Sequence, residues 1–167
     1  PIDKFVHVDL YLPGCPPTPE LFIKALTEGE NAKIASIVCQ ECGRKKLPDM
    51  RPKSISGPRS GTPDPDICLI NQGYLCLGTS TRGGCGALCT RPGHACVGCR
   101  GPANPYLNKD PEFVLDNLRR VFTRMTDIPI EEINAALASP WLSLFLGQFT
   151  DYTQDQSLPQ RTKEKMI

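Results

Sequence analysis

The sequence predicts an irregular fold that is mostly coil, with a few α-helices and one β-strand near the N-terminus. Three observations lead to this expectation. The 167 residues include 17 prolines and 14 glycines, which interrupt most apolar runs before they reach helix length. Nine cysteines lie in a chain of single-domain size. Regular apolar periodicity is confined to short segments near both ends, so such a chain needs cross-links or bound metal to hold it together.

The strand is predicted for residues 5–12. Val6, Val8, Leu10 and Leu12 occupy alternate positions, which is the period-2 pattern of a strand. The prolines that follow from position 13 remove backbone donors and end it. Because a single strand is not stable without neighbours, we expect the rest of its sheet upstream of residue 1 or on another polypeptide.

A first helix is predicted directly after this segment. Thr18 can cap it and Pro19 suits its first turn. Its expected apolar face consists of Leu21, Phe22, Ala25 and Leu26. The sequence therefore predicts a short amphipathic helix next to Cys15.

Two more helices are predicted in the C-terminal third. One starts at Pro111 after a cap at Asp110, and the other runs from Ile130 to about Ala138, before Pro140. The first is expected to bury Phe113, Leu115, Leu118, Val121, Phe122 and Met125. The apolar segment around Trp141 is expected in the core or against a large partner subunit, and residues 151–167 are expected to wrap the surface or a partner.

Two loops separate these elements. Residues 43–67 contain five prolines and six basic residues, which predicts either a solvated loop or a basic surface near a redox partner or a cluster. Residues 68–102 contain six cysteines and eight glycines with little apolar periodicity. We interpret this second loop as backbone wrapped around inorganic cores.

The cysteine spacing separates two candidate metal sites. Cys39 and Cys42 form one close pair and Cys96 and Cys99 another, and a gap of two residues suits both zinc and iron–sulfur clusters. The simplest partition gives a first cysteine set and a second cysteine set. The first is Cys39, Cys42, Cys68 and Cys76, and the second is Cys85, Cys89, Cys96 and Cys99. Cys15 is left alone and must join ligands supplied elsewhere.

Disulfides and structural zinc are the alternatives for these cysteines. An odd number argues against a disulfide framework. Zinc sites usually combine two close pairs, whereas Cys68 and Cys76 are separated by seven residues. Glycines at positions 83, 84, 86 and 98 favour iron–sulfur clusters, because glycine lets backbone amides approach the sulfur atoms. His94 is expected to have a surface or hydrogen-bonding role, and His7 a structural one.

Four segments resemble the cluster motifs of NiFe hydrogenase small subunits. Residues 8–20 resemble the last motif of the proximal cluster, and residues 68–78 resemble the distal motif. Residues 81–86 and 96–102 resemble the medial motifs. The resemblance covers about residues 5–102 and includes every cysteine.

This resemblance implies a role for each cysteine. Cys15 is the implied fourth ligand of a proximal 4Fe–4S cluster, the second cysteine set holds a medial one and the first a distal one. Many relatives have histidine in place of Cys39 and proline in place of Cys89. With cysteine at both positions, two all-thiolate 4Fe–4S clusters of low potential are expected, as in the soluble cytoplasmic type of these enzymes.

The resemblance also implies the organisation and partners of the chain. Residues 1–30 would end a flavodoxin-like α/β domain, and residues 31–167 would form the iron–sulfur cluster domain. The expected partners are a large subunit with the NiFe centre, a domain or chain with the other proximal ligands, and a flavin or iron–sulfur acceptor subunit. The whole would be an oxidoreductase in which this chain relays electrons and has no catalytic residue.

Two other functions remain as alternatives. A quinone-reductase iron–sulfur subunit shares residues 14–17 but lacks the eight later cysteines. A zinc-stapled interaction module would explain the basic loop, yet no recognition helix rich in Lys and Arg is present and nucleic acid is not an expected partner. The longest apolar stretch, 141–149, is too short to span a membrane.

Overall fold

The computed structural model describes residues 5–7, 9–10, 12–14, 16–29, 34–57, 60–103, 105 and 111–138. These contain the α-helices α1 (Pro19–Glu28), α2 (Val38–Cys42), α3 (Pro111–Met125) and α4 (Ile130–Leu137), and the 3-10 helix η3 (Ile70–Gln72). Within the same residues the only strand pairing consists of isolated bridges. The prediction of a mostly irregular chain with a few helices is therefore confirmed.

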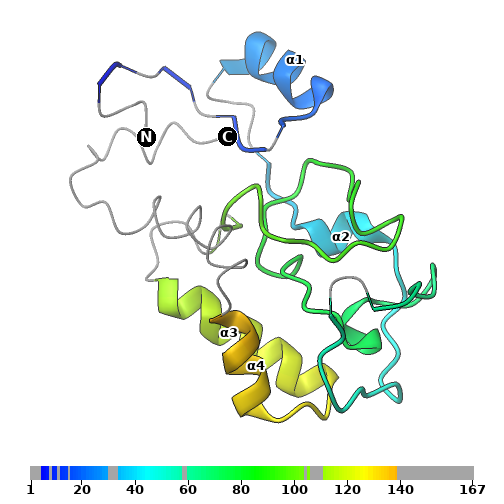
Figure 1. The fold of residues 1–167 in the computed structure, drawn as a ribbon. Coiled ribbons are helices and arrows are strands. Elements are labelled where there is room, and N and C mark those ends of the chain that lie inside the picture. The colour runs from blue at the N-terminus through cyan, green and yellow to red at the C-terminus, as the bar shows by residue number, and fades with distance from the viewer. Residues whose placement is uncertain are drawn as a thin grey trace.

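Helix α1 and the helix pair α3 and α4 lie at opposite ends of an irregular middle layer. Figure 1 shows α1 at one end, the pair α3 and α4 at the other, and α2 with the cysteine-bearing loops between them. Single bridges fasten these loops to each other: Lys45 pairs with Ile67, Ser56 with Tyr74, Ile37 with Arg82, and Thr81 with Pro102. None of the described helices is both long and apolar enough to cross a bilayer.

Helix α1 starts as predicted but buries a narrower face. The Thr18 side chain accepts a hydrogen bond from the Leu21 amide at 3.3 Å, and Pro19 occupies the first turn. Leu21 and Ala25 are buried against Ile34, whereas Phe22 is 51% exposed and Leu26 73% exposed. Only two of the four residues of the predicted apolar face are therefore buried, because the described part of this chain covers only one side of the helix.

The segment before α1 does not show the predicted strand in its described part. Residues 5–7, 9, 10 and 12 form turns, bends or irregular backbone. Val8, Tyr11 and Cys15 lie outside the described residues. An unpaired strand has no partner for its backbone groups, which is the physical reason a lone alternating pattern need not fold as one.

Helices α3 and α4 form where the sequence places them and pack against each other. The buried side of α3 is formed by Val114, Leu118 and Phe122, spaced four residues apart on one face. Phe113, predicted to be buried, is 46% exposed, and Val114 takes its place. Asp110, Pro140, the Trp141 segment and residues 151–167 lie outside the described residues.

The main apolar core joins this helix pair to the cysteine loops. Leu118 and Phe122 from α3 and Ile133 and Leu137 from α4 belong to it. Its other members come from α2, from η3 and from the loops, and they are Val38, Cys68, Leu69, Ile70, Tyr74, Leu75, Cys76, Leu77, Ala87, Cys96 and Ile128. Cys68, Cys76 and Cys96 are therefore fixed to a packed scaffold rather than to a free loop.

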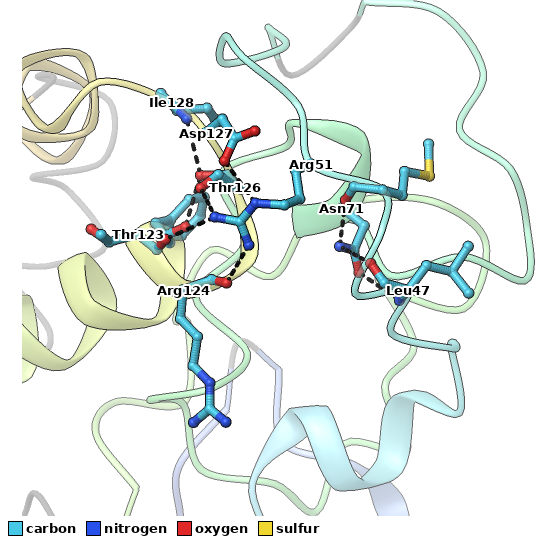
Figure 2. A network of polar contacts seen from close by, with 10 residues as sticks. Leu47, Arg51, Asn71, Thr123, Arg124, Thr126, Asp127 and Ile128 are labelled. Carbon is cyan, nitrogen blue, oxygen red and sulfur yellow. Dashed lines mark hydrogen bonds and ion pairs between the residues drawn. The ribbon is translucent and has the colours of Figure 1, made fainter.

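Polar contacts anchor the basic loop 43–67 to the scaffold (Figure 2). Arg51 donates hydrogen bonds to the carbonyls of Thr123, Arg124 and Thr126 at the end of α3 and pairs with Asp127 at 2.7 Å. The Asn71 side-chain amide donates hydrogen bonds to the carbonyls of Leu47 and Met50, and its oxygen accepts one from the Leu47 amide. Hence the described part of the loop is largely exposed, as predicted for a solvated loop, but its path is held by the partly exposed Arg51 and the buried Asn71.

Candidate metal centre

Helix α2 presents the first two cysteines of the first cysteine set. Gln40 caps it by accepting the Ile37 amide at 2.9 Å, and Gly43 ends it with a positive φ of 74°. The amides of Val38 and Cys39 donate to the carbonyls of Thr81 and Gly78 at 3.0 and 3.2 Å. This short helix, which was not predicted, is therefore docked directly on the loop that follows Cys76.

Electrostatic interactions link residues of the first cysteine set, Cys39 with Cys42 and Cys68, and Cys76 with Cys39 and Cys68. Cys68 and Cys76 are buried in the main core, and the Cys68 amide bonds the Lys45 carbonyl at 2.7 Å. Burial raises the pKa of Cys39 to about 11, nearby Lys46 lowers it, and Cys68 and Cys42 add to the rise. The interactions place these thiols in one electrostatic neighbourhood.

Cys76 occupies the most enclosed position of that set. Burial raises the pKa of its thiol to about 12, against the lowering effect of backbone hydrogen bonds at Gly78 and Cys96. Such thiols stay protonated unless a cation takes the place of the proton, which is what metal binding supplies. The chemistry of this donor set fits a thiolate-bound metal group.

The second cysteine set lines a single cavity of about 320 Å³. Cys85, Cys89, Cys96 and Cys99 all line it, together with Pro16, Pro17, Thr18, Pro19, Val38, Thr81, Ala87, Leu88, Thr90, Val97 and Arg100. Cys96 is buried, Cys85 and Cys99 are half-buried and Cys89 is exposed. A cavity with four thiols and otherwise mostly apolar walls fits an iron–sulfur cluster shielded from water.

Tight backbone turns shape this cavity. Gly84 has a φ of 88°, and a Cβ there would lie 2.6 Å from Ile34 Cδ1. Gly98, between Cys96 and Cys99, has a φ of 82°. Both positions need glycine, which agrees with the sequence-based expectation that glycines allow close approach around the cysteines.

The two cysteine sets meet at Cys96. The Cys96 amide donates a hydrogen bond to the Cys76 Sγ at 3.3 Å, and the Leu77 amide donates to the Cys96 carbonyl at 2.8 Å. Burial raises the pKa of the Cys96 thiol to about 12, and the neighbouring Cys76 adds to that rise. A member of one set is therefore in direct contact with a member of the other.

The described residues bring the members of the two predicted cysteine sets together in different ways. The first set gathers around α2 and the core, and the second lines one cavity, but their roles as ligands stay predictions. Cys15 lies outside the described residues. No three His, Cys, Asp or Glu side chains within the described ranges converge closely enough to hold a single metal ion. His94 is exposed, and His7 lies 3.4 Å from Asp9.

Comparison with known proteins places the chain in a family. No family model matches it. However, a subunit of the F420-non-reducing hydrogenase of Methanothermus fervidus is 40% identical over 124 residues, covering 71% of this chain and 92% of that protein. The chain belongs to this family of F420-non-reducing hydrogenase subunits.

Two longer members of the family are also similar. A vhu subunit of the F420-non-reducing hydrogenase of Methanocaldococcus jannaschii is 46% identical over 112 residues, covering 65% of this chain and 38% of that protein. The F420-non-reducing hydrogenase iron-sulfur subunit of Archaeoglobus profundus is 36% identical over 118 residues, covering 63% and 37%. The chain therefore spans less than two fifths of these relatives. The resemblance to hydrogenase small subunits drawn from the cysteine motifs is confirmed.

In this member of the hydrogenase subunit family, two site residues were missed by sequence reasoning. The Glu41 carboxylate, between Cys39 and Cys42, accepts hydrogen bonds from Ser36 Oγ at 2.6 Å and from the amides of Gly84 and Gly86 at 2.5 and 3.0 Å. Arg100 is buried beside the second cysteine set. Their positions within and directly after close cysteine pairs were the available signal.

Arg100 differs from the exposed basic residues because its guanidinium is buried next to acidic groups. Burial lowers the pKa of its guanidinium from the ordinary value, while Cys85, Cys99 and Glu41 act in the opposite direction. Because arginine stays charged in proteins, a positive charge is present next to the second cysteine set.

Proposed function

We propose that this chain is the electron-relay part of a NiFe hydrogenase small subunit. It conducts electrons between a NiFe site on a large subunit and a redox partner. The first cysteine set holds the distal 4Fe–4S cluster, the second set holds the medial one, and Cys15 contributes to a proximal one. Bound clusters of this kind take up and release electrons at potentials set by their ligands and surroundings.

The contact between Cys96 and Cys76 is the observation that carries this proposal. A hydrogen bond of 3.3 Å joins a member of the second set to a member of the first, with no side chain between them. Electron transfer between two metal sites requires them to lie close together, and this contact joins the two cysteine sets directly. In a relay, it gives the electron a short path through covalent bonds and one hydrogen bond.

The surrounding residues fit this role. Pro17 and Val38 contribute to the mostly apolar walls of the cavity of the second set, which limit the contact of a bound group with water. The Glu41 carboxylate fixes the loop that carries Cys85 to the helix that carries Cys39 and Cys42. The chain thereby holds both cysteine sets in one rigid relation, which a relay requires.

Ligand type argues for a low-potential relay. Relatives of the NiFe hydrogenase type often have a histidine in place of Cys39 and a proline in place of Cys89. The two cysteines of this chain provide thiolates instead, and the added negative charge lowers the reduction potential. This favours an acceptor subunit with flavin or iron–sulfur clusters and a cytoplasmic enzyme.

Residues 1–30 and 31–167 are proposed to belong to different domains. Leu21 and Ala25 belong to an apolar cluster that is separate from the main core and that reaches across the proposed boundary to Ile34. The strand that the sequence predicts at residues 5–12 would form only against other strands of the flavodoxin-like domain, which lie upstream. The same upstream domain, or another chain, would supply the remaining ligands of the proximal cluster.

Metal and sulfide analysis tests the proposal. Iron, acid-labile sulfide and zinc would be measured in the full-length protein purified anaerobically in its native assembly, with electron paramagnetic resonance after reduction. We expect at least about eight iron and eight sulfide per chain, from two four-iron clusters, with interacting signals. Roughly two zinc and no sulfide would instead identify the zinc-stapled module.

Separation from the large subunit provides the control. The same protein without its large subunit should keep its clusters and show no hydrogen oxidation, because no residue of this chain cleaves hydrogen. Hydrogen oxidation by the separated protein would contradict the division of roles.

A further inference from the structure

Arg100 directly follows Cys99 and is one of the most deeply buried charged residues in the described part of the chain. Its side chain is 2% exposed. The Nε atom donates a hydrogen bond to the Gly83 carbonyl at 2.7 Å, which fixes the guanidinium against the loop before Cys85. A charged group held in this way does not reach solvent.

The other two guanidinium nitrogens lack hydrogen-bond partners among the described residues. Nη1 and Nη2 are both buried and make no hydrogen bond there. Buried polar groups in folded proteins are almost always hydrogen-bonded, and leaving charged donors unsatisfied is costly. A group that the described residues do not provide is therefore expected beside them.

The neighbouring acidic groups indicate what that group is. Arg100 is bonded to the carbonyl of Gly83, Glu41 to the amide of the next residue, Gly84, and Cys85 follows directly. The Glu41 carboxylate already accepts hydrogen bonds from Ser36, Gly84 and Gly86. Cys85 and Cys99 line the same cavity as Arg100 and remain as counter-charges when they are thiolates.

We propose that Arg100 supplies the buried positive charge that offsets the negative charge of the second cysteine set and raises the reduction potential of the cluster held there. The inference rests on the proposed function. A positive charge favours the more negative, reduced form of a cluster, and hydrogen bonds to its sulfur atoms act in the same direction. Because Arg100 is buried, its charge is poorly screened.

The first cysteine set offers a matched comparison. Its nearby cation is Lys46, which interacts with Cys39 but is exposed to solvent. Water weakens that charge. The chain thus places a strong cation at one cysteine set and a weak one at the other, which separates the potentials of the two sites.

Redox titrations followed by electron paramagnetic resonance test this assignment. The full-length protein, purified anaerobically in its native assembly, would be compared with Arg100→Gln, Arg100→Lys and the control Lys46→Gln. We expect Arg100→Gln to lower the midpoint potential of the medial cluster with its iron retained and the distal potential unchanged. Arg100→Lys should lower it less, and Lys46→Gln should barely shift the distal potential.

Three results would overturn the assignment. An unchanged medial potential in Arg100→Gln with four iron retained would remove the electrostatic role. Equal shifts of both clusters would make the effect non-local. Loss of medial iron from both Arg100 variants would mean that Arg100 only supports folding. Absence of sulfide from the unaltered protein would instead overturn the proposed function, and this inference with it.

Discussion

Cys68 and Cys76 of the first cysteine set are buried in the main apolar core, whereas in the second set only Cys96 is, and its other cysteines are carried by a glycine-rich loop that polar contacts brace. Cys68 and Cys76 pack with Leu69, Leu75 and Leu77 beneath the helix pair. In the second set, Cys89 and the adjacent Leu88 are exposed, and Glu41 and Arg100 fix the backbone around Cys85. One site is thus positioned mainly by packing and the other mainly by hydrogen bonds.

The largest effect is expected from removing packing under the first set. Phe122 is fully buried in the core that contains Cys68 and Cys76. Phe122→Ala should lower the free energy of unfolding by about 3–5 kcal/mol, because a large cavity remains. Anaerobic denaturant unfolding would measure it. The half-exposed Phe113→Ala serves as the control, and an equal loss there would contradict the packing argument.

Removing the main polar brace should affect the second set selectively. Glu41→Gln keeps the side-chain volume but removes the charge that accepts the Gly84 and Gly86 amides, each worth about 1.5–3 kcal/mol when the acceptor is charged. We expect faster loss of medial iron during dilution, with distal iron retained. The exposed Glu131→Gln is the control. Equal loss from both sites would show that the two sets are not supported separately.

Changing one ligand in each set sharpens the comparison further. Cys89→Pro should leave a three-iron medial cluster at higher potential, because the site loses one thiolate and one iron. Cys39→His should keep four irons and raise only the distal potential, because a neutral ligand replaces a charged one. Iron analysis with electron paramagnetic resonance would distinguish the two. An unchanged four-iron medial spectrum in Cys89→Pro would refute the ligand partition.

The smallest effect is expected at the far side of the scaffold. Arg51→Gln removes the contacts between the basic loop and the end of α3 shown in Figure 2. Because this side chain is partly exposed, we expect a loss of only about 1 kcal/mol in unfolding free energy and unchanged cluster potentials. The exposed Lys53→Gln is the control. A shifted potential in Arg51→Gln would show that the contact between the loop and the end of α3 also influences the clusters.

Much of the fold could be predicted because its signals are local. The cap at Thr18 and the proline after it define the start of α1, and the apolar spacing of residues 111–137 defines α3 and α4. The errors were made where burial depends on partners. Phe22 and Leu26 carry an apolar pattern but are exposed. Helix α2 was missed because five residues are too few to show periodicity.

The sequence by itself determined the two close cysteine pairs, Cys39 with Cys42 and Cys96 with Cys99, and which family the chain resembles, because close spacing along a chain forces proximity in space. Only the tertiary structure decided that Cys96 contacts Cys76, that Glu41 braces the Cys85 loop 43–45 residues away, and that Arg100 is buried. These contacts join segments far apart in the sequence. Their existence depends on how the loops pack on the helix pair, which no local pattern of residues encodes.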